Sequence, residues 1–268
     1  MRVLTQRLLT LLNNESFGST NETIANTMIE RLYELDKLTI DDLSDLCHVS
    51  KSTLSKFVRN LGFDSFKDFK LTVIEEKEKP FYKYSNTITI DKFIEKNGIQ
   101  KYVEILSDDI NLAVREISQE KIKKIAKMIF NSSKVAAFGT TYSETVALDF
   151  QYMMAFNKKY IYTSLDDLKQ DAFIETADND TLVIIFSNSG KYLREYQLIK
   201  GHPKKKTFNH TGAKVVLITS NKDYLSNPYV DLVIDTSFST NLQNHPYVFR
   251  VINEMILTEY KRIIKKSF

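Results

Sequence analysis

Two short amphipathic helices joined by a tight turn are predicted between Thr39 and Phe66, and this segment constrains the fold more than any other. Thr39 and Asp42 have the spacing of a capping box, which starts the first helix. Ser50 is a favourable N-cap for the second helix, and Gly62 is typical of a residue that ends one. Helices this short must bury their apolar sides against further helices. The segment therefore predicts a helix-turn-helix inside a helical N-terminal domain.

The second predicted helix has one apolar and one polar side. Its apolar positions, at helical spacing, are Leu54, Phe57, Val58 and Leu61. The other side carries hydroxyl and basic groups, which can contact base edges and phosphates in the DNA major groove. The residues expected to contact DNA are Lys51, Ser52, Thr53, Ser55, Lys56 and Arg59. The alternative is an ordinary helical hairpin whose polar side faces only water.

Positive charge is local to this predicted DNA-binding side. Residues 1–90 hold 12 Lys and Arg against 13 Asp and Glu, a net charge of −1. From Lys51 to Lys70, five basic residues accompany two acidic ones, which gives a net charge of +3. Phosphate attraction is therefore expected to be modest and sensitive to salt. Useful affinity should then depend on a dimer.

Residues 1–80 resemble the N-terminal domain of the RpiR-type bacterial transcription regulators. The resemblance lies in Val49–Thr53 and in Leu61–Phe63, a leucine-glycine-phenylalanine element that ends the helix-turn-helix in that family. His48 stands at the turn position where the family usually has glycine. A positive φ there would cost histidine about 1 kcal/mol relative to glycine. The resemblance implies a double-stranded DNA operator as partner.

The sequence pattern changes beyond the helical N-terminal region. Pro80 ends the run of helices, and residues 81–90 form either a linker or a short strand. Two helices are predicted within residues 100–131, and after them short apolar runs alternate with helical segments. The predicted strands are residues 134–139, 159–163, 181–187, 214–219 and 229–235. The later predicted helices are residues 143–157 and 165–177, one that follows Gly190, and residues 243–266.

This alternation indicates a parallel sheet with helices on both faces. The expected fold is an all-α helix-turn-helix domain at residues 1–80, a linker at 81–99, and an α/β domain at 100–268. The last helix offers apolar side chains for a dimer interface. These are Val251, Ile252, Met255, Ile256 and Tyr260.

Two hydroxyl-rich turns follow predicted strands of the α/β domain. In open α/β sheets, ligands bind beyond the carboxyl ends of the strands. Hydroxyl and free backbone N–H groups at such turns can surround a phosphate, aided by a helix dipole. The candidate ligand-binding residues are Gly139, Thr140 and Ser143 in the first turn, and Ser187, Asn188, Ser189 and Gly190 in the second. The alternative for each is a plain turn with a helix cap.

The region from about residue 119 to residue 260 resembles the SIS, or sugar isomerase, domain. That family binds phosphorylated sugars through a Ser-x-Ser-Gly turn and a Gly-x-Gly-x-Ser turn. The matching positions are Ser187, Ser189, Gly190, Gly139 and Ser143. Two positions depart from the pattern: Thr141 replaces the second glycine, and Tyr192 replaces a smaller hydroxyl residue. The resemblance implies a phosphorylated sugar as effector.

The leading interpretation is a non-enzymatic, dimeric transcription regulator of sugar metabolism that senses a phosphorylated sugar and alters its binding to an operator. One alternative is a sugar-phosphate isomerase, which needs a general base. The candidate bases, each more simply a surface or capping group, are Glu144, Glu195, Glu254 and His245. Another alternative is a regulator whose SIS domain only dimerises.

Several classes of protein are disfavoured by composition. One cysteine and four separated histidines give neither a disulfide framework nor a zinc signature, so we expect a cytoplasmic protein without metal or cofactor. No stretch approaches the roughly 20 apolar residues of a membrane span. Met1–Leu12 is typical of an amphipathic helix rather than a signal peptide. The lysines at 204–206 are typical of a solvated surface loop, with a phosphate or DNA contact as the alternative.

Overall fold

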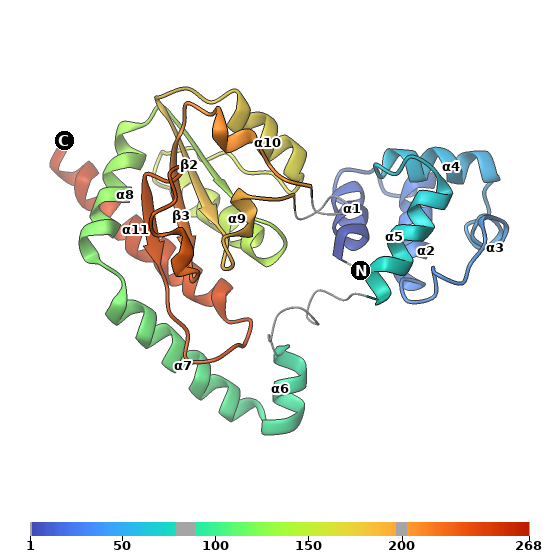
Figure 1. Cartoon of the computed structure of the whole chain (residues 1–268), viewed down its shortest axis with the longest axis horizontal. Coiled ribbons are helices and arrows are strands. Elements are labelled where there is room, and N and C mark those ends of the chain that lie inside the picture. Colours follow the sequence, from blue (N-terminus) through green and yellow to red (C-terminus); the bar gives the residue numbers. More distant parts are fainter. Residues whose placement is uncertain (1, 79–88, 197–202, 268) are drawn as a thin grey trace. The chain divides into compact units, whose positions relative to one another are not determined.

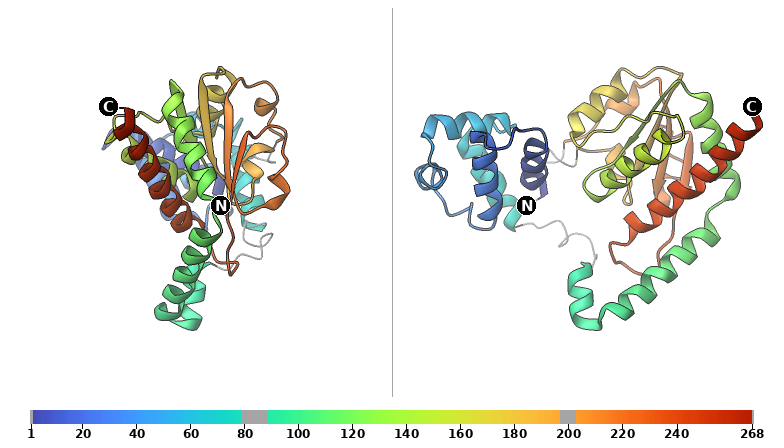
Figure 2. Two further views of the ribbon diagram at one scale, coloured as in Figure 1. Left: turned by 90° about the vertical axis from the view of Figure 1, so that its left-hand side faces the viewer. Right: turned by 180° about the vertical axis from the view of Figure 1, so that it is seen from behind.

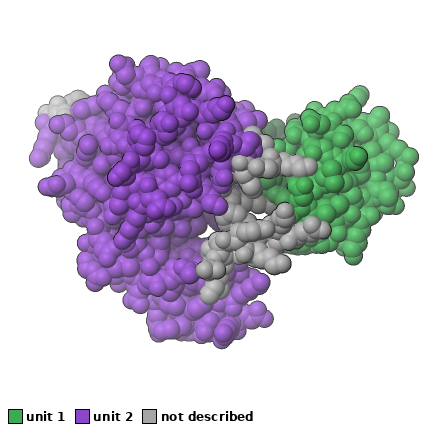
Figure 3. All heavy atoms as spheres, in the orientation of Figure 1, with its two compact units in different colours: residues 1–86, 198–201 green, residues 87–197, 202–268 purple. Residues whose placement is uncertain are grey.

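The computed structural model describes residues 2–78, 89–196 and 203–267 (Figures 1 and 2). The chain divides into two compact units, one over residues 1–86 and one over residues 87–197 and 202–268 (Figure 3). Residues 81–88, the first part of the predicted linker, lie outside the described residues. The rest of that predicted linker, to residue 99, is occupied by helix α6 and the start of α7.

The first unit is a bundle of helices around one apolar core. Its helices are α1 (Arg2–Leu12), α2 (Thr20–Glu30), α3 (Ile40–Leu46), α4 (Lys51–Asn60) and α5 (Phe66–Glu78). Apolar side chains at helical spacing meet in the core, where Leu8, Met28, Phe57 and Phe69 are fully or almost fully buried. The predicted amphipathic helix at the N-terminus is therefore confirmed as α1.

The second unit is built on a four-stranded parallel sheet. In spatial order the strands are β1 (Lys134–Phe138), β2 (Thr181–Phe186), β3 (Lys214–Thr219) and β4 (Leu232–Asp235). Its α-helices are α6 (Ile90–Asn97), α7 (Ile99–Glu116), α8 (Gln119–Asn131), α9 (Tyr142–Ala155), α10 (Asp167–Glu175) and α11 (His245–Ser267). The predicted α/β fold, with a parallel sheet flanked by helices, is confirmed.

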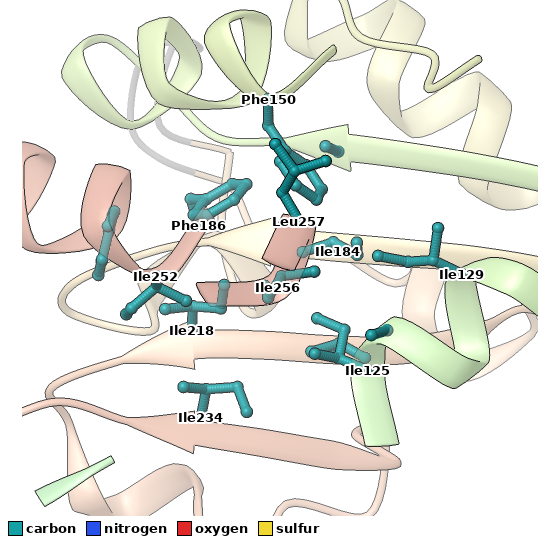
Figure 4. Packing of buried hydrophobic residues seen from close by; sticks show 14 of the residues in the cluster. Ile125, Ile129, Phe150, Ile184, Phe186, Ile218, Ile234, Ile252, Ile256 and Leu257 are labelled. Atoms are coloured by element: carbon teal, nitrogen blue, oxygen red, sulfur yellow. The ribbon is translucent and has the colours of Figure 1, made fainter. Parts of the chain in front are cut away.

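Helices cover both faces of this sheet. On one face α8, α9 and α11 pack over the strands, and Figure 4 shows Ile252 and Ile256 of α11 close to Ile184, Ile218 and Phe186 of the sheet. On the other face, side chains of α10 pack against β1 and β2 with those of two short 3₁₀ helices, η2 (Lys191–Leu193) and η3 (Thr207–Asn209). The strands are apolar on both sides because both sides are buried.

Two predicted elements differ from the structure. Residues 159–163 form no strand, because only Tyr162 pairs with β1, through a single bridge to Ala136. After Gly190 the chain forms the short η2 rather than a longer helix. Tyr192 and Leu193 both turn into the core, and the chain then bends back so that Glu195 pairs with Lys204. The residues between, 197–202, lie outside the description.

The expected dimer interface on the last helix is also wrong for three of its five residues. Ile252, Ile256 and Tyr260 are buried in the core of their own unit, against α8 and the sheet. A helix that lies across a sheet packs its apolar side against that sheet, so these side chains are not on the surface. Over the three described ranges, no helix is long and apolar enough to cross a membrane.

Candidate functional site

Helices α3 and α4 begin with side-chain caps that define the helix-turn-helix. In the capping box of α3, the Thr39 N–H donates to the Asp42 carboxylate at 2.8 Å, and the Asp42 N–H donates to Thr39 Oγ1 at 3.1 Å. At the start of α4, the Thr53 N–H donates to Ser50 Oγ at 3.1 Å. Both caps satisfy backbone donors that a helix start leaves open.

The turn between the two helices depends on His48. Its φ is +53°, in the left-handed region that favours glycine. The His48 N–H donates to the Asp45 carbonyl at 3.1 Å, and the Val49 N–H donates to the Ser44 carbonyl at 3.0 Å. These two bonds form a Schellman motif, which ends α3 and directs the chain into α4. The positive φ considered from the sequence is therefore present.

The second helix presents its polar side to solvent. Leu54, Phe57 and Val58 are buried in the core of the first unit, which fixes the rotation of α4. Of the residues predicted to contact DNA, Lys51, Ser52, Lys56 and Arg59 are exposed, and Thr53 and Ser55 are half-buried. The structure thus brings all six predicted residues onto one short helix.

Some of these groups already have partners. The Ser50 hydroxyl lies 2.9 Å from both Ser52 Oγ and Thr53 Oγ1, so these two hydroxyl groups are bonded to the N-cap residue of α4 in the free protein. The Lys51 ammonium forms an ion pair with Asp41 at the start of α3. Any phosphate that contacts Lys51 therefore competes with a carboxylate of the same domain.

Lys70, one of the five basic residues counted in the sequence, is bonded within its own domain. Its ammonium donates to the carbonyl oxygens of Leu35 and Leu38, at 2.7 and 2.5 Å, and so holds the segment between α2 and α3. Burial lowers the pKa of this lysine. Where the chain is described, Lys56 and Arg59 have no ion-pair partner. On α4, the unpaired positive charge is thus that of Lys56 and Arg59, and Lys67 of α5 is a further exposed basic residue in this stretch.

The end of α4 is a second Schellman motif. Gly62 has φ +84°, its N–H donates to the Arg59 carbonyl, and the Phe63 N–H donates to the Val58 carbonyl at 3.2 Å. The Arg7 guanidinium donates to the Gly62 carbonyl at 3.0 Å and lies 4.6 Å from the centre of the Phe63 ring. The leucine-glycine-phenylalanine element therefore fastens α4 to α1.

In the second unit, the two hydroxyl-rich turns meet at one edge of the sheet. Strands β1 and β2 are parallel neighbours, with Phe138 opposite Ile185 near their carboxyl ends. The turns that follow these strands therefore lie next to each other. This is the position where open α/β sheets bind ligands.

Both turns require glycine. A Cβ on Gly139 would lie 2.7 Å from backbone and side-chain carbons of Ser143, at the start of α9. Gly190 has φ +72°, and a Cβ there would lie 2.3 Å from the Tyr224 ring. Such distances leave no room for any other residue. The close packing brings the start of α9 against the end of β1.

The serine turn is organised by hydrogen bonds to its own backbone. The Gly190 N–H donates to the Ser187 carbonyl at 3.0 Å, and the Tyr192 N–H lies 3.4 Å from Ser187 Oγ. The Asn188 carbonyl accepts from the Thr219 hydroxyl at 2.9 Å, which ties the turn to β3. Of the predicted ligand groups, Ser189 is exposed, Thr140 and Asn188 are half-buried, and Ser143 and Ser187 are nearly buried.

Beneath these turns lies a polar network that the sequence did not reveal. Glu144 accepts from the Gly139 N–H at 2.9 Å, from the Thr163 hydroxyl, and from Gln170 Nε2 at 3.0 Å. The Tyr192 hydroxyl donates to Gln170 Oε1 at 2.6 Å. Gln170 belonged to no motif, and Tyr192 was noted only as a departure from one, because helical spacing alone does not show which polar side chain will be buried.

Glu144 is not a surface or capping group, contrary to expectation. Only 1% of it is exposed, and burial raises the pKa of its carboxyl from the ordinary 4.5 to about 8, although its hydrogen bonds oppose this shift. Tyr192 replaces the smaller hydroxyl expected beyond the serine turn. Its side chain is almost completely buried, and burial raises the pKa of its phenol well above 10.

The three lysines at 204–206 do not behave alike. Lys204 and Lys206 are exposed, whereas the Lys205 ammonium is buried 3.8 Å from the centre of the Tyr192 ring and 3.6 Å from the Asp171 carboxylate. Burial lowers its pKa. The prediction of a solvated triplet is therefore wrong for Lys205, which anchors its loop to α10. Within the described ranges, no group of three or more His, Cys, Asp or Glu could hold a metal ion.

Known proteins resemble the chain in both units. Residues 6–80 match the helix-turn-helix domain of the rpiR family. An uncharacterized HTH-type transcriptional regulator of Clostridium perfringens is 22% identical over an alignment of 270 positions that covers 97% of this chain and 93% of the relative. Another, from Thermotoga maritima, is 22% identical over 91% of this chain and 85% of its own length.

Solved structures share the fold. The Vibrio vulnificus NanR protein, complexed with ManNAc-6P, aligns with a TM-score of 0.51 and 12% identity over 98% of this chain and 93% of its own. The E. coli CFT073 protein c3406 aligns with a TM-score of 0.50 and 15% identity over 66% of this chain and 94% of its own. At these identities the likeness establishes the fold alone.

Proposed function

We propose that this chain, a transcription regulator of the rpiR family with a sugar isomerase-like (SIS) domain, senses a phosphorylated sugar and changes its affinity for an operator in response. The observation that carries this proposal is the meeting of the two glycine turns at the carboxyl edge of β1 and β2. A domain of this fold has no evident need for such turns if it only dimerises. The sensor would act in the cytoplasm, where bacterial DNA is read.

A phosphate is the ligand group that these turns suit best. Ser187 and Ser189 offer hydroxyl groups, and the N-terminus of α9 supplies positive dipole charge beside Thr140 and Ser143. The NanR protein of the same fold is complexed with ManNAc-6P, a named precedent for this choice of probe. Residues Gly139, Thr140, Ser143, Ser187, Asn188, Ser189 and Gly190 remain the proposed ligand-binding set.

The DNA contacts are proposed for the exposed side of α4. Lys56 and Arg59 would hold phosphates, and Ser52 and Ser55 would approach base edges. Lys51 and Thr53 stay in the proposed set. In the free protein Lys51 pairs with Asp41, and Ser52 and Thr53 bond to Ser50. Each half-site would receive one such helix, so the operator calls for two copies of the chain.

A second copy would pack on the outer side of α9. Large apolar side chains are exposed along this helix and just beyond it, at Tyr142, Leu148, Tyr152, Phe156 and Tyr160. Tyrosine and phenylalanine are enriched in interfaces, and contiguous exposed apolar surface marks contact sites. Replacing Phe156, which is 86% exposed, by Ser should shift sedimentation towards the monomer. Phe17→Ser, at a residue 98% exposed in the other unit, is the matched control.

Isomerase activity is the competing function, and Glu144 is the one observation in its favour. Carboxyl groups with a raised pKa occur at acid–base sites. However, both Glu144 oxygens accept hydrogen bonds from Thr163, Gly139 and Gln170, and the group is buried. Turnover of hexose or pentose phosphates that is abolished by Glu144→Gln would establish the enzyme instead.

Ligand binding is tested by thermal shift. A sugar phosphate that binds only the folded protein raises its melting temperature. With ManNAc-6P, glucose 6-phosphate and inorganic phosphate as probes, we expect a shift that Ser187→Ala together with Ser189→Ala removes. Ser118→Ala, which deletes only the cap of α8, should retain the shift. A shift that survives the double substitution would place the ligand elsewhere.

A further inference from the structure

Gln170 joins the two turns assigned to the ligand. It lies on α10 and is 1% exposed. Its Nε2 is 3.0 Å from the Gly139 carbonyl oxygen in the first turn, and its Oε1 is 2.6 Å from the hydroxyl of Tyr192, just beyond the second turn. One side chain therefore bonds to both segments, which follow the neighbouring strands β1 and β2.

The orientation of this amide follows from its surroundings. Nε2 lies 2.6 Å from the Ser164 carbonyl oxygen as well as 3.0 Å from that of Gly139. Carbonyl oxygens only accept hydrogen bonds, so the NH₂ group must face them. Oε1 is then left to accept from Tyr192. The reverse orientation would place an oxygen against two carbonyl oxygens, one buried and one half-buried, and would remove the donor that both share.

Each end of this bridge is fixed to its turn. Glu144, bonded to Gln170, also accepts the Gly139 N–H at 2.9 Å. The Tyr192 N–H is within 3.4 Å of Ser187 Oγ, and its ring is held against Lys205 and Phe208. A displacement of the serine turn that moves Tyr192 must strain or break the bond to Gln170. Buried bonds of this kind are costly to leave unmade.

We propose that Gln170 is a positioning residue that couples the two turns, so that ordering one of them orders the other. The functional meaning of this coupling rests on the proposed sugar-phosphate site. The coupling itself is a property of the ligand-free protein and can be measured there. The coupling is a free energy of interaction between the two turns, transmitted through the Gln170 side chain.

Hydrogen exchange with a double-mutant cycle tests the coupling without ligand. Tyr192→Phe keeps the ring and deletes the hydroxyl that bonds to Gln170. We expect exchange of the Gly139 amide to accelerate about fivefold, the effect of one net hydrogen bond. In the Gln170→Met background, the same deletion should change this rate less than about twofold, because the bridge is already absent.

Gln151→Met is the matched control. Gln151 donates one bond, to the Ile161 carbonyl at 2.7 Å, and contacts neither turn. In that background Tyr192→Phe should still accelerate Gly139 exchange about fivefold. If Gln170→Met does not fold, the proposal is decided by the Gly139 exchange rate in Tyr192→Phe compared with that in the unchanged chain. Unchanged exchange at Gly139 in Tyr192→Phe would overturn the proposal.

A ligand arm separates this proposal from the proposed function. Glucose 6-phosphate or inorganic phosphate, bound to the unchanged chain, should slow exchange in residues 139–144 and 187–192 together. In Gln170→Met the slowing should be unequal between the two turns. If neither probe nor ManNAc-6P binds the unchanged chain, the proposed ligand class fails, while the Tyr192→Phe result still decides the coupling.

Discussion

At the scale of single residues, the turn between α3 and α4 holds His48 in an unfavourable backbone conformation. His48 adopts φ +53° in the turn between α3 and α4, where glycine would bear no steric cost. We expect His48→Gly to raise the free energy of unfolding of the first unit by up to about 1 kcal/mol. Urea denaturation measures this. Asp45→Gly, inside α3, is the control and should lower stability by about 0.3 kcal/mol; a loss in both variants would show that the turn is not strained.

The buried carboxyl of Glu144 makes stability depend on pH. Its pKa is about 8 when folded and near 4.5 when unfolded, so the folded state holds the proton more tightly between these values. The stabilisation is complete below about pH 4.5 and is lost as the pH rises through about 8, by at most about 1.4 kcal/mol per pH unit. Denaturation midpoints of the second unit from pH 5 to 9 should show this slope.

Glu144→Gln is the control for this prediction, because it keeps the shape of the side chain and cannot titrate. The decline in stability between pH 5 and 8 should flatten in this variant. An equal decline in both proteins would mean that another group is responsible, and that Glu144 is ionised in the folded state.

At the scale of elements, α4 has an N-cap and a buried apolar side that fix its position, but it carries few positive charges for binding DNA. Lys56 and Arg59 supply the available cations of this helix, since Lys51 pairs with Asp41, whereas Lys70 of α5 holds the α2–α3 segment. Lys56→Ala and Arg59→Ala should each weaken DNA binding and reduce the salt-dependence slope by about 1. Lys70→Ala should lower stability and leave that slope unchanged. Fluorescence anisotropy against salt concentration measures all three, and a slope that falls for Lys70→Ala would contradict the assignment.

The helices and strands also show which features can be predicted from sequence patterns. The caps at Thr39 and Ser50, the glycine stop at Gly62 and the apolar strands were predictable, because each depends on a few neighbouring residues. The missing strand at 159–163 was not, since a strand needs a partner with which to form a ladder. The contacts of Lys70 and Lys205 could not be predicted either. Each ammonium is held by carbonyl oxygens or an aromatic ring from a segment distant in the sequence.

At the scale of the whole chain, the order of the two domains was predictable, and the polar network that links the two glycine turns was not. The motifs located both glycine turns through local residue types. The link between them depends on Gln170, which is 31 residues from Gly139 and 22 from Tyr192 along the chain. Such a contact follows from the topology of the sheet. A motif search therefore finds the groups proposed to touch a ligand before it finds those that hold them in place.

In the proposed function, one chain links sugar-phosphate binding to operator binding. Its most direct measurement is the affinity of the full-length protein for an operator recovered from bound genomic DNA, titrated with ManNAc-6P and with glucose 6-phosphate at fixed moderate salt. We predict that an effector changes the dissociation constant by about fivefold or more, and that operator DNA changes effector affinity by the same factor. An unchanged dissociation constant, for a chain that demonstrably binds both the operator and the sugar phosphate, would contradict the account.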